Sequence, residues 1–192
     1  RTHPEFGHAA TFFVYSWSPF GEPSQAEAKF KFLLENGMEI GNHTFSHKDL
    51  AYASPEEVAA EIGKLANEVR RICGYDTVSL ALPYGGYPKS TENLLGGTWD
   101  GQDYVNKGIL LVGAEPAPSP YSKKFNPLAI PRIRGSQDEL DKWLRELEKY
   151  PETRFISDGR NDTVTIRQAD VANLNQDMAA DRTVRVYAPP EE

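Results

Sequence analysis

Residues 38–73 of the chain read MEIGNHTFSHKDLAYASPEEVAAEIGKLANEVRRIC and contain one strand-to-helix unit. The short apolar run Met38–Gly41 predicts a buried strand. Ser54 is followed three residues later by Glu57, which is a helix-start signal, and Pro55 suits the first helical position because no partner is lost with its missing N–H. Apolar side chains then recur every three or four residues, so one face of this helix is expected to pack on a core. They are Val58, Ile62, Leu65, Val69 and Ile72.

Short strands and amphipathic helices alternate on both sides of this unit. The helix-start signal recurs at Ser24, before Glu27, and at Ser136, before Glu139. This alternation is typical of an α/β domain built on a parallel sheet or barrel. The other expected strands are Ala10–Tyr15, Val78–Leu82, Ile109–Val112, Ala129–Arg134 and Phe155–Ser157, with peripheral strands at Val164–Ile166 and Val184–Val186.

Composition narrows the class of protein. The 192 residues, 39% of them apolar, are enough for one folded domain. The formal net charge of −7 argues against binding to nucleic acid, which requires a basic face. No apolar run approaches the roughly 18 residues of a membrane span, so no transmembrane segment is expected in this chain. Cys73 is the only cysteine, which excludes an internal disulfide framework and a multi-thiolate metal site.

Two histidines come directly after the predicted strand Met38–Gly41. His43 and His47 are four residues apart, a spacing that on a helical turn places both imidazoles on one side, where one metal ion can bind them. The position after a strand is where α/β barrels carry their active sites. Thr44 stands where a zinc protease of the HExxH type has its glutamate, so a protease of that type is excluded. The alternative is a pair of packing or surface histidines in a loop.

A second candidate segment is the strand end Leu80–Pro88, which passes into a proline and a glycine-rich turn. A backbone N–H exposed at such a turn can point at a developing oxyanion. Tyr84 and Tyr87 offer flat faces to a sugar ring. The alternative is an ordinary strand-to-loop turn.

Together these segments resemble the polysaccharide deacetylase family, whose members remove N-acetyl groups from chitin, peptidoglycan and related polymers. Residues 10–14 look like its second strand, residues 39–47 match its metal motif, and residues 82–85 are similar to its third motif. The resemblance covers roughly residues 7–159 and implies an α/β fold, a deformed (β/α) barrel that lacks its first strand in this chain. It further implies a single catalytic domain over residues 1–192, incomplete at its N-terminus, with residues 167–192 as a C-terminal extension.

The resemblance also implies a set of site residues. A divalent transition metal, expected to be zinc, would be held by His43 and His47. The backbone N–H of Tyr84 would face the oxyanion, and Asp158 would stand in for the family's terminal histidine as the acid. The substrate pocket would be bordered by Leu82, Pro83 and Tyr84.

The sequence departs from the family pattern at three places. The family's first motif, a strand ending in two aspartates, lies well upstream of residues 10–14, so the general base and the third metal ligand are expected outside this sequence. Ala81 replaces an arginine, and Asp158 replaces a histidine; the alternative for Asp158 is a turn residue before Gly159. Arg132 or Arg134 would then offer the missing guanidinium, or both are ordinary surface arginines.

These observations favour a metal-dependent deacetylase acting on an N-acetylhexosamine polymer, with peptidoglycan as the expected substrate. The corresponding location is extracellular or attached to the surface of a bacterial cell. One alternative is a catalytically impaired carbohydrate-binding or structural domain of the same fold. Another is an esterase acting on small O-acetylated sugars, which would use the same site residues.

Overall fold

The computed structural model describes residues 9–16, 18–113, 115–153, 159–160 and 162–188. The chain divides into two compact units. Unit 1 comprises Arg1–Gly113 and Pro127–Pro131, and unit 2 comprises Ala114–Asn126 and Arg132–Glu192. The single domain expected over residues 1–192 stays a prediction.

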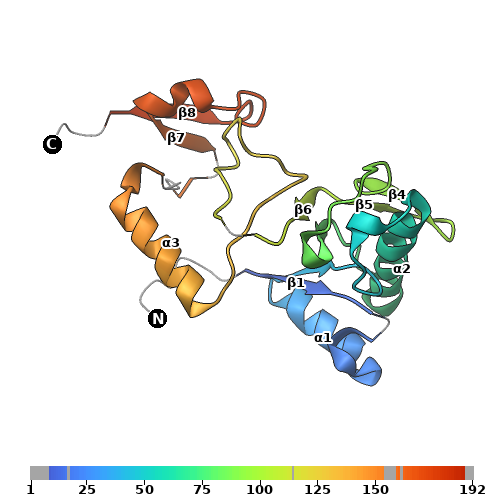
Figure 1. Cartoon of the computed structure of the whole chain (residues 1–192). Coiled ribbons are helices and arrows are strands. Elements are labelled where there is room, and N and C mark those ends of the chain that lie inside the picture. The colour runs from blue at the N-terminus through green and yellow to red at the C-terminus, as the bar shows by residue number, and fades with distance from the viewer. Residues whose placement is uncertain (1–8, 17, 114, 154–158, 161, 189–192) are drawn as a thin grey trace. The chain divides into compact units, whose positions relative to one another are not determined.

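Unit 1 is built on a four-stranded parallel sheet in the order β1-β2-β3-β6. Figure 1 labels its two outer strands, β1 and β6. The strands are β1 (Thr11–Val14), β2 (Glu39–Asn42), β3 (Ser79–Ala81) and β6 (Gly108–Leu110). Val14 pairs with Asn42, Asn42 with Leu80, and Leu80 with Ile109, so the carboxyl ends of all four strands meet at one edge. The predicted α/β class is confirmed, and this sheet corresponds to a partial (β/α) barrel without its first strand.

Two helices connect the strands of unit 1. In α2 (Pro55–Cys73) the predicted capping box is present, because the Ser54 side chain accepts from the Glu57 backbone and the Glu57 side chain accepts from Ser54. Helix α1 (Pro23–Glu35) begins before the predicted cap Ser24. The cap is Glu22, whose side chain accepts from the Ser24 N–H at 3.3 Å. The helix begins earlier than predicted because Pro23 occupies the first helical position without needing a partner for an N–H.

Helix α2 carries the core of unit 1 on two adjoining faces. The predicted stripe divides between two clusters of buried side chains, so α2 packs against both the β1–β2 region with α1 and the β3–β6 region. The first cluster contains Val14, Phe30, Ile40, Leu65 and Val69. The second contains Leu50, Val58, Ile62, Ala66, Leu80, Leu82, Leu94, Tyr104 and Ile109.

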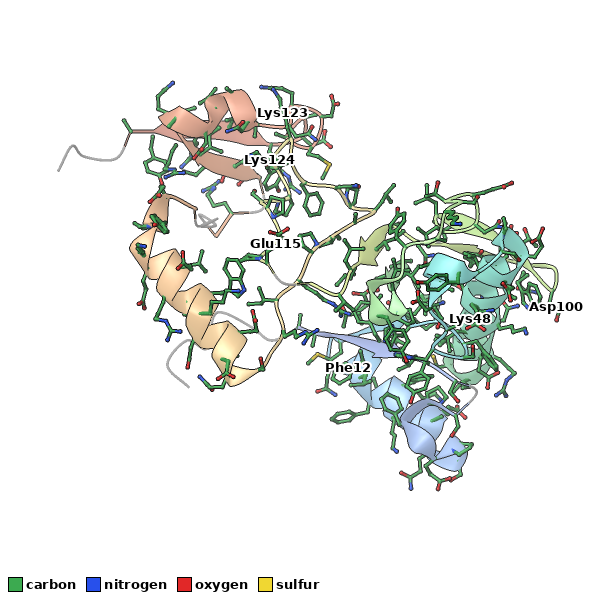
Figure 2. The ribbon with its side chains drawn as sticks, in the orientation of Figure 1. Phe12, Lys48, Asp100, Glu115, Lys123 and Lys124 are labelled. Atoms are coloured by element: carbon green, nitrogen blue, oxygen red, sulfur yellow. The ribbon has the colours of Figure 1, made fainter. Side chains whose placement is uncertain are left out.

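The hairpin formed by β4 (Gly96–Trp99) and β5 (Gln102–Val105) was not among the expected elements. Its two-residue turn contains Asp100 and Gly101, with φ of +50° and +70°. An Asp-Gly pair is a strong hairpin signal because both positions need a left-handed backbone. Figure 2 shows Asp100 at the outer tip of this hairpin.

Unit 2 contains α3 (Gln137–Lys149) and a parallel pair of strands, β7 (Thr163–Arg167) and β8 (Thr183–Tyr187). These strands confirm the two peripheral strands expected near the C-terminus. Val164, Leu174 and Ala179 form the small core of the unit. Lys123 and Lys124, labelled in Figure 2, belong to the same unit, and the Lys123 ammonium donates to the Ala172 carbonyl at 2.9 Å.

The strand expected over Ala129–Arg134 does not form. Ile130 makes a single bridge with Leu110. Prolines 127 and 131 flank that bridge and have no N–H for a longer ladder. The expected strand Phe155–Ser157 lies outside the described residues.

The remaining helices are short 3₁₀ turns. Among the described residues, none of the helices is long and apolar enough to cross a membrane. The 3₁₀ turns are Pro19–Gly21, Leu50–Tyr52, Pro83–Gly85, Pro151–Thr153 and Gln168–Asn173.

Gly63 allows α2 to approach the hairpin, so Gly63→Ala is expected to destabilise the protein. In an unobstructed helix interior, alanine is favoured over glycine by about 0.5–1 kcal/mol. A Cβ at Gly63 would instead lie 2.2 Å from Trp99 Cβ. We therefore expect Gly63→Ala to lower the free energy of unfolding in urea by about 1–3 kcal/mol.

Gly135→Ala is the control, because a Cβ there meets nothing within 4 Å. It should change the free energy of unfolding by less than about 0.5 kcal/mol. A Gly63→Ala protein more stable than the parent would show that helix propensity outweighs the contact with Trp99.

Candidate metal centre

His43 follows the last residue of β2 and is oriented by the neighbouring strands. Its backbone N–H donates to the Val14 carbonyl at 2.9 Å, and its ring Nδ1 lies 2.6 Å from the Ala81 carbonyl oxygen. A carbonyl only accepts, so Nδ1 carries the hydrogen, and in the neutral ring the lone pair belongs to Nε2. Such a hydrogen bond is the usual way in which a metal-binding histidine is held in one tautomer.

His47 lies beside His43, with ring centroids 4.8 Å apart and the rings at 83°. The spacing suggested a helical turn, but that is wrong, since Thr44 and His47 have left-handed φ of +64° and +58°. These two residues bend the chain back, and the imidazoles meet without a helix. Left-handed conformations of non-glycine residues are costly and concentrate at functional sites.

Backbone groups of α2 hold this turn in place. Asn42 is fully buried; its Nδ2 donates to the Ile62 carbonyl at 3.0 Å, and its Oδ1 accepts from the Thr44 N–H at 2.9 Å. The Phe45 N–H donates to the Glu61 carbonyl at 2.9 Å. A side chain at the end of β2 and the carbonyls of a helix therefore define the path between the two histidines.

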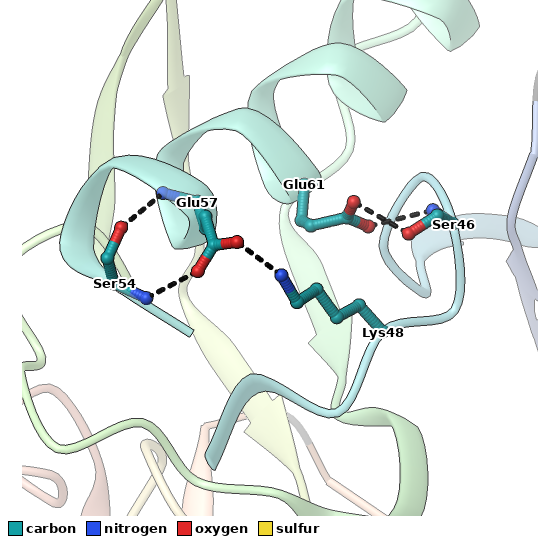
Figure 3. A network of polar contacts seen from close by, with 5 residues as sticks. All are labelled: Ser46, Lys48, Ser54, Glu57 and Glu61. Carbon is teal, nitrogen blue, oxygen red and sulfur yellow. Dashed lines mark hydrogen bonds and ion pairs between the residues drawn. The ribbon is translucent and has the colours of Figure 1, made fainter. Parts of the chain in front are cut away.

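Figure 3 shows the polar network outside the turn. The Glu61 carboxylate accepts from both the N–H and the hydroxyl of Ser46, each at 2.7 Å. One turn earlier on α2, Glu57 pairs with Lys48, and the hydrogen bond from Lys48 lowers the pKa of the Glu57 carboxyl. Because Glu57 also closes the capping box with Ser54, the helix that anchors the turn is itself secured at its start.

The segment after β3 brings Tyr84 to the histidines. Leu82 and Pro83 are buried, and the Leu82 N–H donates to the Leu110 carbonyl at 3.0 Å. Tyr84 follows with φ of +57°, and its ring centroid lies 5.0 Å from that of His47. The roles of these three residues as a substrate border, and of the Tyr84 N–H as an oxyanion donor, stay predictions.

Gly86 closes this segment against the loop that follows His47. A Cβ at Gly86 would lie 1.7 Å from Asp49 Oδ1, which accepts from the Ala51 N–H at 3.0 Å. Glycine is required here because the carboxylate occupies the space of a side chain.

Sequence reasoning missed three residues around the histidines. The Tyr15 ring centroid is 5.3 Å from that of His47, and Asn42 and Glu61 form the bonds described above. A polar residue at the end of a buried strand was the available signal for Asn42. Tyr15 ends the apolar run of β1 and lies at the same sheet edge because the strands are parallel. For Glu61 no local signal existed, since it contacts the turn only through the fold.

The two histidines lie together, and their role as metal ligands stays a prediction. Within residues 9–16, 18–113, 115–153, 159–160 and 162–188, no group of three or more His, Cys, Asp or Glu side chains is placed to hold a metal ion. Asp158, the predicted acid, lies outside the described residues.

Solved structures with similar chains include a peptidoglycan deacetylase, PdaC from Bacillus subtilis, at 31% identity over 44% of this chain and 39% of that chain, with a TM-score of 0.37. The Streptococcus pyogenes deacetylase PplD in complex with acetate is 22% identical over 60% of this chain and 49% of that one, with a TM-score of 0.44. A CE4 family pseudoenzyme from Bacillus anthracis is 21% identical over 42% and 27% of the two chains, with a TM-score of 0.36. The chain thus spans less than half the length of each of these proteins.

The family model for polysaccharide deacetylases matches residues 4–97. That range contains the first three strands of the sheet, both connecting helices, the two histidines and Tyr84. About half of the chain, residues 4–97, is therefore similar to the polysaccharide deacetylase family.

Proposed function

We propose that this chain is the metal-binding part of an enzyme that hydrolyses N-acetyl groups of an N-acetylhexosamine polysaccharide, with peptidoglycan as the polymer. The observation that carries the proposal is the pair His43 and His47, brought together at the carboxyl edge of the sheet with His43 oriented by the Ala81 carbonyl. A secreted or surface-attached bacterial protein is the matching location, because the polymer lies outside the cell membrane.

The donor chemistry of the turn fits zinc or another divalent transition metal. Catalytic zinc sites use three protein ligands, and two imidazoles are a common part of that set. Thr44 Oγ1 is buried and has no hydrogen-bond partner among the described residues. It is therefore available to form a hydrogen bond with a polar group bound at the turn. The third ligand is proposed to come from the aspartate pair that the family carries upstream of β1.

A bound metal supplies Lewis-acid polarisation of the acetyl carbonyl and a lowered pKa for water. The residues of this chain have separate tasks. His43 and His47 bind the ion, and Glu61 holds the backbone that carries His47. The Tyr84 N–H is proposed to donate to the oxyanion, and Asp158 to give a proton to the leaving amine. An upstream aspartate is proposed to remove a proton from the attacking water.

A second candidate function is a carbohydrate-binding domain with impaired catalysis. It is favoured by Ala81, which is fully buried and stands where the family's third motif has an arginine. Acetate release by the full-length protein separates the two functions.

Substitution of either histidine is expected to abolish stoichiometric metal binding. The full-length protein should contain one divalent ion per chain, and His43→Ala or His47→Ala should reduce the metal content at least about tenfold, because a zinc site loses a direct ligand. Elemental analysis after dialysis against a fixed free-zinc buffer measures this. Unchanged metal content in both variants would place the ion elsewhere.

Glu61→Gln is expected to weaken metal binding without removing a ligand. A glutamine presents one oxygen and one NH₂ group to Ser46, so one of the two donors of Ser46 loses its acceptor. Residues that orient metal ligands typically change metal affinity by about 10- to 100-fold. Competition titration with a zinc chelator should show a loss of this size.

Glu57→Gln is the matched control, because Glu57 lies one turn earlier on α2 and contacts Lys48 and Ser54 instead of Ser46. It should leave the zinc affinity within about twofold, since a glutamine can still accept from Lys48 and the contact lies outside the segment between His43 and His47. Equal losses in the two variants would mean that helix stability, and not the Glu61–Ser46 contact, controls binding.

In the full-length enzyme, Tyr84→Phe should keep kcat for acetate release within about threefold, whereas His47→Ala should lose nearly all activity. The hydroxyl of Tyr84 has no proposed role, while its backbone N–H is kept in phenylalanine. Chitin oligomers and peptidoglycan are the two substrates. If the protein holds one metal ion and releases no acetate from either substrate, the carbohydrate-binding domain is the correct function.

A further inference from the structure

Two exposed tyrosine residues each place a ring beside His47 of the candidate metal centre. The centroid of Tyr15 is 5.3 Å from that of His47, and the centroid of Tyr84 is 5.0 Å from it. Tyr15 is 52% exposed and Tyr84 is 69% exposed, so both residues are open to solvent. Large aromatic groups exposed beside a polar site are typical of ligand-binding surfaces.

The order of the strands places the segments that carry the two tyrosines on either side of the segment that carries the histidines. Tyr15 follows β1, the histidines follow β2, and Tyr84 lies three residues after the end of β3, in a sheet of order β1-β2-β3-β6. Val14 pairs with Asn42, and Asn42 pairs with Leu80. The sheet edge therefore presents an aromatic ring, two imidazoles and a second aromatic ring in sequence.

The position of Tyr15 is defined by its neighbours. Val14 is buried in the core with Phe30 and Ile40. Ser16 turns the chain with φ of +75°, and its N–H donates to the Phe45 carbonyl at 2.8 Å. Tyr15 is thus held between a buried residue and a constrained turn, and its ring contacts His47 at 58° while half of the residue stays exposed.

We propose that Tyr15 and Tyr84 form a binding site for the pyranose rings of an N-acetylhexosamine oligosaccharide, one on each side of His47. The inference rests on the proposed function for its substrate class and adds Tyr15 as a binding residue. A pyranose ring has an apolar C–H face that packs on a flat aromatic ring, and its hydroxyls stay hydrated. The rings of such a sugar are neutral, so binding has no long-range charge repulsion to overcome in a chain with a net charge of −7.

This binding does not depend on the metal. Both contacts are ring faces, and neither tyrosine is a proposed ligand. Sugar binding should therefore persist after chelation of the metal, while acetate release does not.

The test is a calorimetric titration of the full-length protein with the tetramer of N-acetylglucosamine, performed in EDTA and again with one equivalent of zinc. Tyr15→Ala and Tyr84→Ala should each weaken binding by about three- to tenfold in both conditions, as expected for the loss of one aromatic contact. Tyr15→Phe keeps the ring and should bind within about twofold of the parent. Tyr15→Leu keeps an apolar side chain without a ring. It replaces Tyr15→Ala in the titration if the alanine variant does not fold.

Phe32→Ala is the matched control. Phe32 is 64% exposed and lies near the end of α1 that leads into the start of β2, at the opposite edge of the sheet. Its removal should leave the affinity for the tetramer unchanged. Far-UV circular dichroism checks that all variants keep the parent's secondary structure.

Three results would overturn the inference: no binding by the parent at millimolar sugar, Tyr15→Ala or Tyr15→Leu binding as tightly as the parent, or Tyr15→Phe losing as much affinity as Tyr15→Ala. Failure of the proposed catalysis gives a different result. If the tetramer binds through Tyr15 and no acetate is released with zinc present, the binding site stands and the deacetylase proposal falls. If acetate is released and Tyr15→Ala is fully active and binds like the parent, the deacetylase proposal stands and the binding site falls.

Discussion

The buried side chain of Asn42 joins the sheet, the helix α2 and the histidine turn. Its amide donates to the Ile62 carbonyl of α2 and accepts from the Thr44 N–H, at 3.0 and 2.9 Å. Both groups of the amide are satisfied away from water, where an unpaired polar group is expensive. The position of β2, one turn of α2 and the path from His43 to His47 are therefore interdependent. A change that moves α2 would move His43 and His47 with it.

Backbone strain is concentrated at the same edge of the sheet. Of the six described non-glycine residues with positive φ, four lie there: Ser16, Thr44, His47 and Tyr84. Conformations of this kind persist only where surrounding contacts over-determine them. Here those contacts are the bonds from Asn42 and Glu61 to the histidine turn and the bond from Ser16 to Phe45. The packed core and α2 therefore hold these residues in backbone conformations that an isolated chain segment would not adopt.

Ala81 stands where the resemblance to the family places an arginine. The replacement removes the charged side chain and keeps the backbone carbonyl. The alanine side chain is fully buried and carries no charge, so it has no guanidinium to offer to a carboxylate. The Ala81 carbonyl nevertheless accepts from His43 Nδ1 at 2.6 Å, which is a backbone function independent of the side chain. The orientation of His43 is therefore independent of the side chain at position 81, so the proposed metal binding and the proposed catalysis require separate measurements.

The sequence by itself determined the α/β class, the capped helix α2 and the histidine pair. Each of these predictions rests on a local pattern: the capping pair Ser54 and Glu57, the apolar stripe on α2, and the four-residue spacing of the histidines. Such patterns can be recognised in the sequence because the residues involved are close neighbours in the chain. Helix α1 begins earlier than its serine indicated, and the strand at Ala129–Arg134 did not form. Only the tertiary structure decided that the histidine turn is not helical and that Tyr15 and Glu61 contact it. Their partners lie 15 to 32 residues away in the chain, and which residues meet depends on strand register and on helix packing rather than on adjacent side chains.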